Sequence, residues 1–152
     1  MAHVADQDRW TYVGHCRSWA PDGPYEVTFD CETAQVRVKA CAPNVLRIWC
    51  DPRGLFRRKY PSFAVEREDL CPVPLSLADG GDYVELHTGT LVVRAEKAPF
   101  RISLWNKKGE LITAQAPGKA LGSSAGEMGA WHTMAPDEAF WGLGEKREDF
   151  NK

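Results

Sequence analysis

The chain has 152 residues, of which 43% are hydrophobic and 26% charged, and its formal net charge is −2. This length fits one domain with a real hydrophobic core. The nearly balanced charge gives no basic face, which argues against nucleic acid and anionic membrane as partners. Apolar runs are far shorter than the ~20 residues of a membrane span, and residues 1–8 lack the basic start and apolar core of a signal peptide. The sequence therefore predicts a cytoplasmic protein.

The first 24 residues are expected to form an N-terminal extension, of which residues 15–19 look structured and residues 20–24 form a loop rich in Pro and Gly. Residues 25–152 are expected to form the domain itself. Its pattern is almost entirely that of β-strands, and no apolar stripe at helical spacing exceeds two turns.

The first three expected strands cover residues 25–30, 33–40 and 44–50. The second alternates most clearly, with Val36 and Val38 on one face and polar side chains between them. A period of two is the pattern of a strand with one face in a core. Residues 51–54, Asp-Pro-Arg-Gly, then form a turn.

The middle of the chain is less regular. A short strand is expected at residues 63–66, and the prolines at 72 and 74 exclude residues 71–76 from a central strand. The sequence Asp-Gly-Gly-Asp at residues 79–82 is a strong turn signal.

Two hairpins are expected next. Residues 83–87 and 90–95 flank Thr88-Gly89, and residues 100–105 and 110–113 flank the turn at 106–109. Residues 115–129, rich in Gly, Ala and Ser, are expected to form a long surface loop, with further strands at 131–134 and 138–143. Many short strands separated by turn signals predict an all-β fold, an antiparallel sandwich or barrel with little or no helix.

Five cysteines, at positions 16, 31, 41, 50 and 71, are interpreted as buried or partly buried thiols. Their odd number and the missing signal peptide argue against a disulfide framework. None has the spacing of a zinc site with another cysteine or with any of the four histidines. The sequence thus predicts neither a metal site nor a cofactor.

Several segments, in their order along the chain, together carry a family resemblance. Residues 44–48 (Asn-Val-Leu-Arg-Ile), 51–56 (Asp-Pro-Arg-Gly-Leu-Phe) and 62–65 (Ser-Phe-Ala-Val) resemble the opening strands of the N-terminal domain of glycoside hydrolase family 31. This family contains α-glucosidases and α-xylosidases. Residues 83–88, 91–95, 99–104 and 108–109 resemble its next two hairpins. Near the end, residues 140–146 (Phe-Trp-Gly-Leu-Gly-Glu-Lys) and 150–152 (Phe-Asn-Lys) resemble its aromatic-Gly-Leu-Gly-Glu motif.

The resemblance implies a β-sandwich of the galactose-mutarotase-like (supersandwich) type that packs on a (β/α)8 barrel. The barrel of the family holds the two carboxylates that a retaining glycosidase requires. Its nucleophilic Asp lies in a Trp-x-Asp-Met-x-Glu sequence, which does not occur in these 152 residues. The substrate-contacting loop of the family would follow Asn151-Lys152. No catalytic residue is therefore expected in this chain, which we interpret as truncated before the barrel.

The resemblance also places the terminal motif near the interface with the barrel. The residues expected there, or near a sugar, are Phe140, Trp141, Gly142, Leu143, Gly144, Glu145 and Arg147. Glu145 is expected to help dock the two domains, with Arg147 as its partner. Of the two rings, one would complete the sandwich core and the other would meet the barrel. Isolated from the barrel, the domain is expected to self-associate through residues 140–143.

Two alternative functions remain open. A free-standing carbohydrate-binding sandwich should present a row of exposed aromatic rings on one concave face. An epimerase-like enzyme should bring a histidine acid, His87 or His132, close to a carboxylate such as Glu85 or Glu127 in a pocket. The preferred hypothesis is the non-catalytic N-terminal domain, which would meet carbohydrate only through the intact enzyme.

Overall fold

The computed structural model describes residues 9–56 and 71–138, and every regular element in these ranges is a β-strand. The strands are β1 (Thr11–Tyr12), β2 (Cys16–Pro21), β3 (Glu26–Cys31), β4 (Gln35–Ala42), β5 (Val45–Asp51), β6 (Ser76–Asp79), β7 (Tyr83–His87), β8 (Leu91–Lys97), β9 (Phe100–Asn106), β10 (Leu111–Ala114), β11 (Leu121–Ser124) and β12 (Glu127–Ala130). Within the described ranges there is no helix of the length and apolarity that crossing a bilayer requires.

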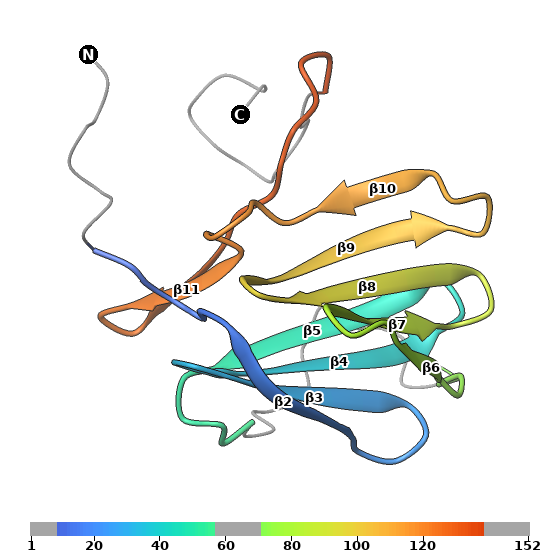
Figure 1. The fold of residues 1–152 in the computed structure, drawn as a ribbon, viewed down its shortest axis with the longest axis horizontal. Coiled ribbons are helices and arrows are strands. Elements are labelled where there is room, and N and C mark those ends of the chain that lie inside the picture. Colours follow the sequence, from blue (N-terminus) through green and yellow to red (C-terminus); the bar gives the residue numbers. More distant parts are fainter. Residues whose placement is uncertain (1–8, 57–70, 139–152) are drawn as a thin grey trace.

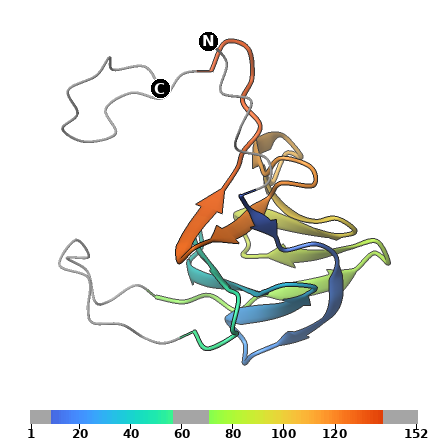
Figure 2. The same cartoon turned by 90° about the vertical axis from the view of Figure 1, so that its left-hand side faces the viewer.

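The strands form three antiparallel sheets. One sheet has the order β2-β3-β4-β5, a second has the order β10-β9-β8-β7-β6, and a small third sheet has the order β1-β11-β12. Figure 1 shows β2 to β5, in blue and cyan, lying against the green and yellow strands of the second sheet. Figure 2 shows the two layers from the side. This arrangement confirms the predicted all-β sandwich.

The core lies between the two larger sheets and explains the period of two in their sequences. In β3 and β4 the buried positions include Val27, Phe29, Val36 and Val38, each 0% exposed, and polar residues alternate with them. The facing sheet contributes Val84, Leu86, Val93, Ala95 and Ile102. The rings of Phe29 and Phe100 meet across the layers with centroids 5.2 Å apart.

The predicted hairpins are confirmed. Tyr83–His87 pairs with Leu91–Lys97, and Phe100–Asn106 pairs with Leu111–Ala114. The three strands expected at 25–30, 33–40 and 44–50 correspond to β3, β4 and β5. Ser76–Asp79, a strand that the sequence did not predict, begins after the two prolines and is an edge strand of its sheet, so residues 71–76 contribute to no central strand. The strand expected at 63–66 and most of the one at 138–143 fall outside the described residues.

The prediction of a surface loop at residues 115–129 is wrong for most of this range. Residues 121–124 and 127–130 form the hairpin β11–β12, and Ala120, Leu121 and Gln115 are buried. The strand expected at 131–134 is also wrong, because His132 makes only an isolated bridge with Gln115. The physical reason is packing. The Trp131 ring lies so close to Gly129 that a Cβ there would be 2.4 Å from its Cη2 atom.

Part of the N-terminal segment is built into the sheets. β2 pairs with β3 over most of its length, and β1 pairs with β11, more than 100 residues away along the chain. Val13, between β1 and β2, is 2% exposed and belongs to the core. The rings of Trp10 and Tyr12 pack edge-on against Trp131, at 4.9 and 5.4 Å between centroids. The proposed division of the chain at residue 24 stays a prediction.

Candidate functional site

The residues expected at a domain interface, Phe140, Trp141, Gly142, Leu143, Gly144, Glu145 and Arg147, lie outside the described residues. Their expected roles, and the self-association expected through 140–143, stay predictions. The described part of the chain still allows the alternative functions to be compared with the geometry. It also contains one pocket that the sequence analysis did not predict.

The structure brings one of the two candidate histidines to a carboxylate. His87 and Glu85 lie on the same face of β7, with 3.2 Å between Nε2 and Oε2. Glu85 also accepts hydrogen bonds from Arg94, at 2.8 Å from Nη2 and 3.2 Å from Nε. These hydrogen bonds from Arg94 hold the pKa of Glu85 below its usual range. His87 is 38% exposed on the outer face of the sheet, so the pair is a surface ion-pair network and not an enclosed acid–base site.

The other candidate pair does not form. His132 contacts Thr113, with 3.1 Å between Nδ1 and Oγ1, while Glu127 forms an ion pair with Arg9. The geometry expected of an epimerase-like site, a histidine facing a carboxylate in a pocket, is therefore not found among residues 9–56 and 71–138.

The contribution of the ion pairs around Glu85 to folding stability should depend on pH in a predictable direction. A lowered folded-state pKa means that ionised Glu85 contributes stability above its unfolded pKa, and that this contribution is lost as the pH falls through the folded pKa. Glu85→Gln should therefore lower the free energy of unfolding by less than about 1 kcal/mol near neutral pH. The difference from the parent chain should shrink between roughly pH 5 and pH 3.

Urea unfolding at a series of pH values measures this difference. Asp82→Asn is the matched control, because the exposed Asp82 side chain forms no ion pair with any other described residue. A Glu85→Gln effect of the same size at pH 3 and pH 6 would show that the carboxylate charge does not stabilise the sheet.

Aromatic rings on the outer faces are covered by arginine side chains. The guanidinium of Arg94 lies 4.6 Å from the ring centroid of Tyr83 and 5.6 Å from that of Trp105. On the other sheet, Arg47 lies 4.0 Å from Trp49. Such cation–π contacts occupy the ring faces on which a sugar would stack. These rings therefore favour packing over a carbohydrate platform, which argues against the carbohydrate-binding alternative.

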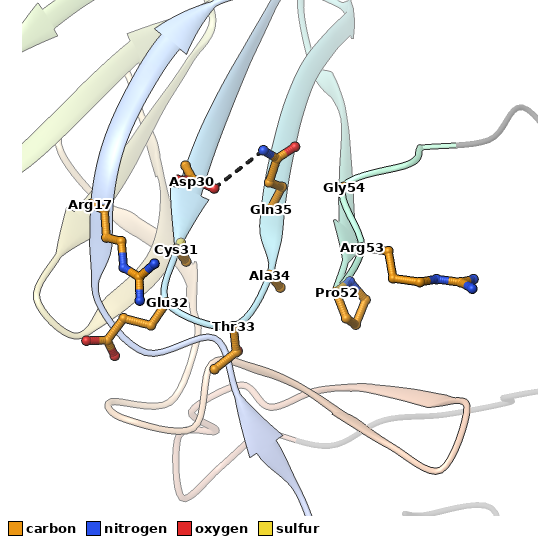
Figure 3. A pocket seen from close by; sticks show the side chains of 10 residues that line it. All are labelled: Arg17, Asp30, Cys31, Glu32, Thr33, Ala34, Gln35, Pro52, Arg53 and Gly54. Atoms are coloured by element: carbon orange, nitrogen blue, oxygen red, sulfur yellow. Dashed lines mark hydrogen bonds between the residues drawn. The ribbon is translucent and has the colours of Figure 1, made fainter.

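A pocket of about 280 Å³ lies at one end of the four-stranded sheet (Figure 3). The turn between β3 and β4, the start of β2 and the turn after β5 form its walls. Its charged and polar lining includes Arg17, Asp30, Glu32, Gln35 and Arg53. Figure 3 shows Arg17 and Glu32 on one side and the Arg53 side chain extending away on the other.

Local interactions fix the shape of this pocket. Gly54 has a φ of +63°, and a Cβ there would lie 2.7 Å from Oε1 of Gln35. The carboxylate of Asp51 accepts the N–H of Arg53 at 2.8 Å and closes the same turn. Gln35 Nε2 donates to Asp30 Oδ1 at 3.4 Å across the strands. The lining contains no histidine, and its single thiol, Cys31, is buried, so its acidic groups are the carboxylates of Asp30 and Glu32.

The acidic and thiol side chains of the described ranges form neither a metal-binding group nor a disulfide. No group of three His, Cys, Asp or Glu side chains in the described ranges is placed to hold a metal ion. Cys16, Cys31, Cys41 and Cys50 are partly or fully buried and form no disulfide, as expected. Cys71 is exposed, which differs from the expectation, because the two prolines that follow it, at 72 and 74, keep this segment outside the sheet.

Comparison with known proteins matches most of the chain to one family of domains. Residues 35–152 match the family model of the glycosyl hydrolase 31 N-terminal galactose mutarotase-like domain. Alpha-glucosidase 2 of Bacillus thermoamyloliquefaciens is 27% identical over 119 residues, which is 78% of this chain and 15% of that enzyme.

Solved structures agree. A family 31 dextranase from Flavobacterium johnsoniae, seen with isomaltotriose and with glucose, superposes with a TM-score of 0.82 and 29% identity over 93% of this chain and 18% of its own. The cycloalternan-forming enzyme of Listeria monocytogenes shares the fold, with a TM-score of 0.72 and 20% identity over 93% of this chain and 14% of its own. The chain thus spans less than a fifth of the length of these relatives. It belongs to the glycosyl hydrolase 31 N-terminal galactose mutarotase-like domain family.

Proposed function

We propose that this chain serves as the non-catalytic N-terminal β-sandwich of a longer family 31 α-glycosidase and packs against the catalytic (β/α)8 barrel of that protein. The observation that carries this proposal is the family match over residues 35–152, combined with relatives that are more than five times longer. By analogy with the α-glucosidase and the dextranase, the intact protein would hydrolyse α-glucosidic bonds with retention.

The chemistry of the described surface supports a non-catalytic role. Glu85, the carboxylate beside His87, is held by Arg94 at 2.8 Å, and Glu96 is held by Arg101 at 2.7 Å. Retaining hydrolysis requires two carboxyl groups about 5 Å apart, one of them protonated. The lowered pKa of Glu85 opposes that second requirement.

One sheet edge fits packing against a later part of the protein. β10 is an edge strand, and its Leu111 and Ile112 side chains are 51% and 54% exposed. Beyond them, Thr133 N–H donates to the Ala114 carbonyl at 2.9 Å, so the chain after β12 already lines the end of this edge. Exposed apolar side chains on an edge strand are a surface that proteins usually cover.

The test compares the 152-residue chain with the protein encoded by the continuing reading frame. The longer protein should release glucose from isomaltotriose and from a chromogenic α-glucoside, and the chain alone should release none. Hydrolysis by the chain alone, or a continuing frame without a barrel and its Trp-x-Asp-Met-x-Glu sequence, would contradict the proposal. Binding of isomaltotriose by the chain alone would favour the carbohydrate-binding alternative. The cytoplasmic location stays a prediction.

A further inference from the structure

The antiparallel pairing of β2 with β3 places two cysteines directly opposite each other. Cys16 and Cys31 are register partners, and both side chains contact the core from the same face of the sheet. The Glu32 N–H donates to the His15 carbonyl at 3.0 Å. The adjacent pair, Cys16 and Cys31, is therefore a non-hydrogen-bonded pair, in which the Cα atoms are about 4.5 Å apart.

That spacing is compatible with a disulfide, whose Cα atoms are usually about 4.4–6.8 Å apart. Other thiols in the described sheet are less well placed. Cys50 lies on β5, opposite Val36, so strand β4 separates it from Cys31. Two strand spacings amount to roughly 10 Å, beyond the reach of a disulfide. Cys41 lies near the opposite end of β4 from Cys31.

The two thiols also differ in their chemistry. The hydrogen bond from the Cys31 side chain lowers the pKa of Cys16, and the same contact, with burial, raises the pKa of Cys31. Burial raises the pKa of Cys50 to about 11. Cys16 is half-buried on an edge strand, whereas Cys31 is 4% exposed. A low thiol pKa and access to solvent are the properties of an attacking cysteine.

We propose that Cys16 and Cys31 form a reversible thiol–disulfide pair that reacts with low-molecular-weight disulfides of the glutathione type. The Cys16 thiolate attacks one sulfur of the small disulfide, which forms a mixed disulfide and releases one small thiol. The Cys31 sulfur then loses its proton and attacks Cys16, which releases the second small thiol. Two protein thiols are oxidised to one disulfide, and one small disulfide is reduced to two thiols.

The product would join the edge strand β2 covalently to its neighbour. β2 pairs on one side with β3, and its ladder with β3 has an irregularity between Cys16 and Ser18. A bond at this point would close a loop of residues 17–30 through the turn that joins β2 to β3. Strand β2 could then not separate from the sheet while the pair is oxidised.

The experiment is titration of the 152-residue chain with mixtures of reduced and oxidised glutathione, followed by thiol counting after denaturation and by peptide mapping. The reduced chain should show all five thiols, and the oxidised chain should lose two. Mapping should find Cys16 linked to Cys31, and excess reduced glutathione should restore both thiols.

Three variants separate the roles. Cys31→Ala should stop the reaction at a glutathione adduct on Cys16, and Cys16→Ser should abolish both adduct and disulfide. The double variant Cys41→Ser with Cys71→Ser is the matched control and should still lose two thiols. Failure of the parent chain to lose two thiols, a disulfide mapped to another pair, or a stable adduct on Cys16 with Cys31 present would overturn the proposal.

Discussion

Replacement of Phe29 by alanine should destabilise the chain by about 3–5 kcal/mol. Phe29 is 0% exposed, and its ring meets that of Phe100 at 5.2 Å between the two sheets. Truncation removes contacts from both layers at once and leaves a cavity that rigid strands do not refill. The midpoint of thermal unfolding should fall by roughly 6–20 °C, at about 2–4 °C per kcal/mol for a domain of this size.

Thermal unfolding followed by circular dichroism measures this shift. Tyr25→Ala is the matched control, because Tyr25 is an aromatic residue just before the same strand but is 38% exposed. Phe29→Leu should cost less than Phe29→Ala, since it leaves a smaller cavity. Equal losses for Phe29→Ala and Tyr25→Ala would mean that the two sheets do not share the core described above.

The central strands were predictable because burial on one face imposes a period of two on the sequence. In β4, Val36 and Val38 are buried while Arg37 and Lys39 face solvent, and that difference is visible in the residue types alone. The hairpins were predictable because their turns contain glycines, such as Gly89 and Gly109, whose φ values are +92° and +78°. Both signals are local.

The third sheet was not predictable, since its stability depends on contacts between distant segments. Gly122 and Gly129 suggested a loop, yet they lie in strands. The Trp131 ring packs where a side chain at 129 would be, and Thr11 and Tyr12 of β1 approach the same position at 122. β1 has two residues, too few for any period to be seen, and its partner is β11. Tertiary packing thus overrides the local preference of glycine for turns.

The candidate site was likewise predictable only where its signal is continuous in the sequence. Family membership could be recognised from motifs that are continuous in the sequence, above all residues 140–146, and the family comparison agrees with it. The pocket could not be predicted, because Arg17, Glu32 and Arg53 come from three segments that only the fold brings together. The opposition of Cys16 and Cys31 depends likewise on the register of β2 against β3.

Substitution of Gln115 is a direct test of the region where the sequence wrongly predicted a surface loop. Gln115 is instead 2% exposed, and its side-chain Oε1 accepts the backbone N–H of Ile102 at 2.9 Å. Its own N–H donates to the Ile102 carbonyl, also at 2.9 Å. The side chain therefore replaces a backbone carbonyl at the point where β10 leaves its partner β9.

Gln115→Met keeps the volume of the side chain but removes the acceptor, so the Ile102 N–H would stay buried without a partner. This should lower the free energy of unfolding by about 1–3 kcal/mol. Amide hydrogen exchange should speed up at Ile102 more than at the neighbouring strand positions. Gln35→Met is the matched control, because Gln35 is only partly buried and its hydrogen bond to Asp30 is long, at 3.4 Å. If both variants were equally stable and Ile102 kept its protection, residues 115–120 would be the surface loop that their composition suggests.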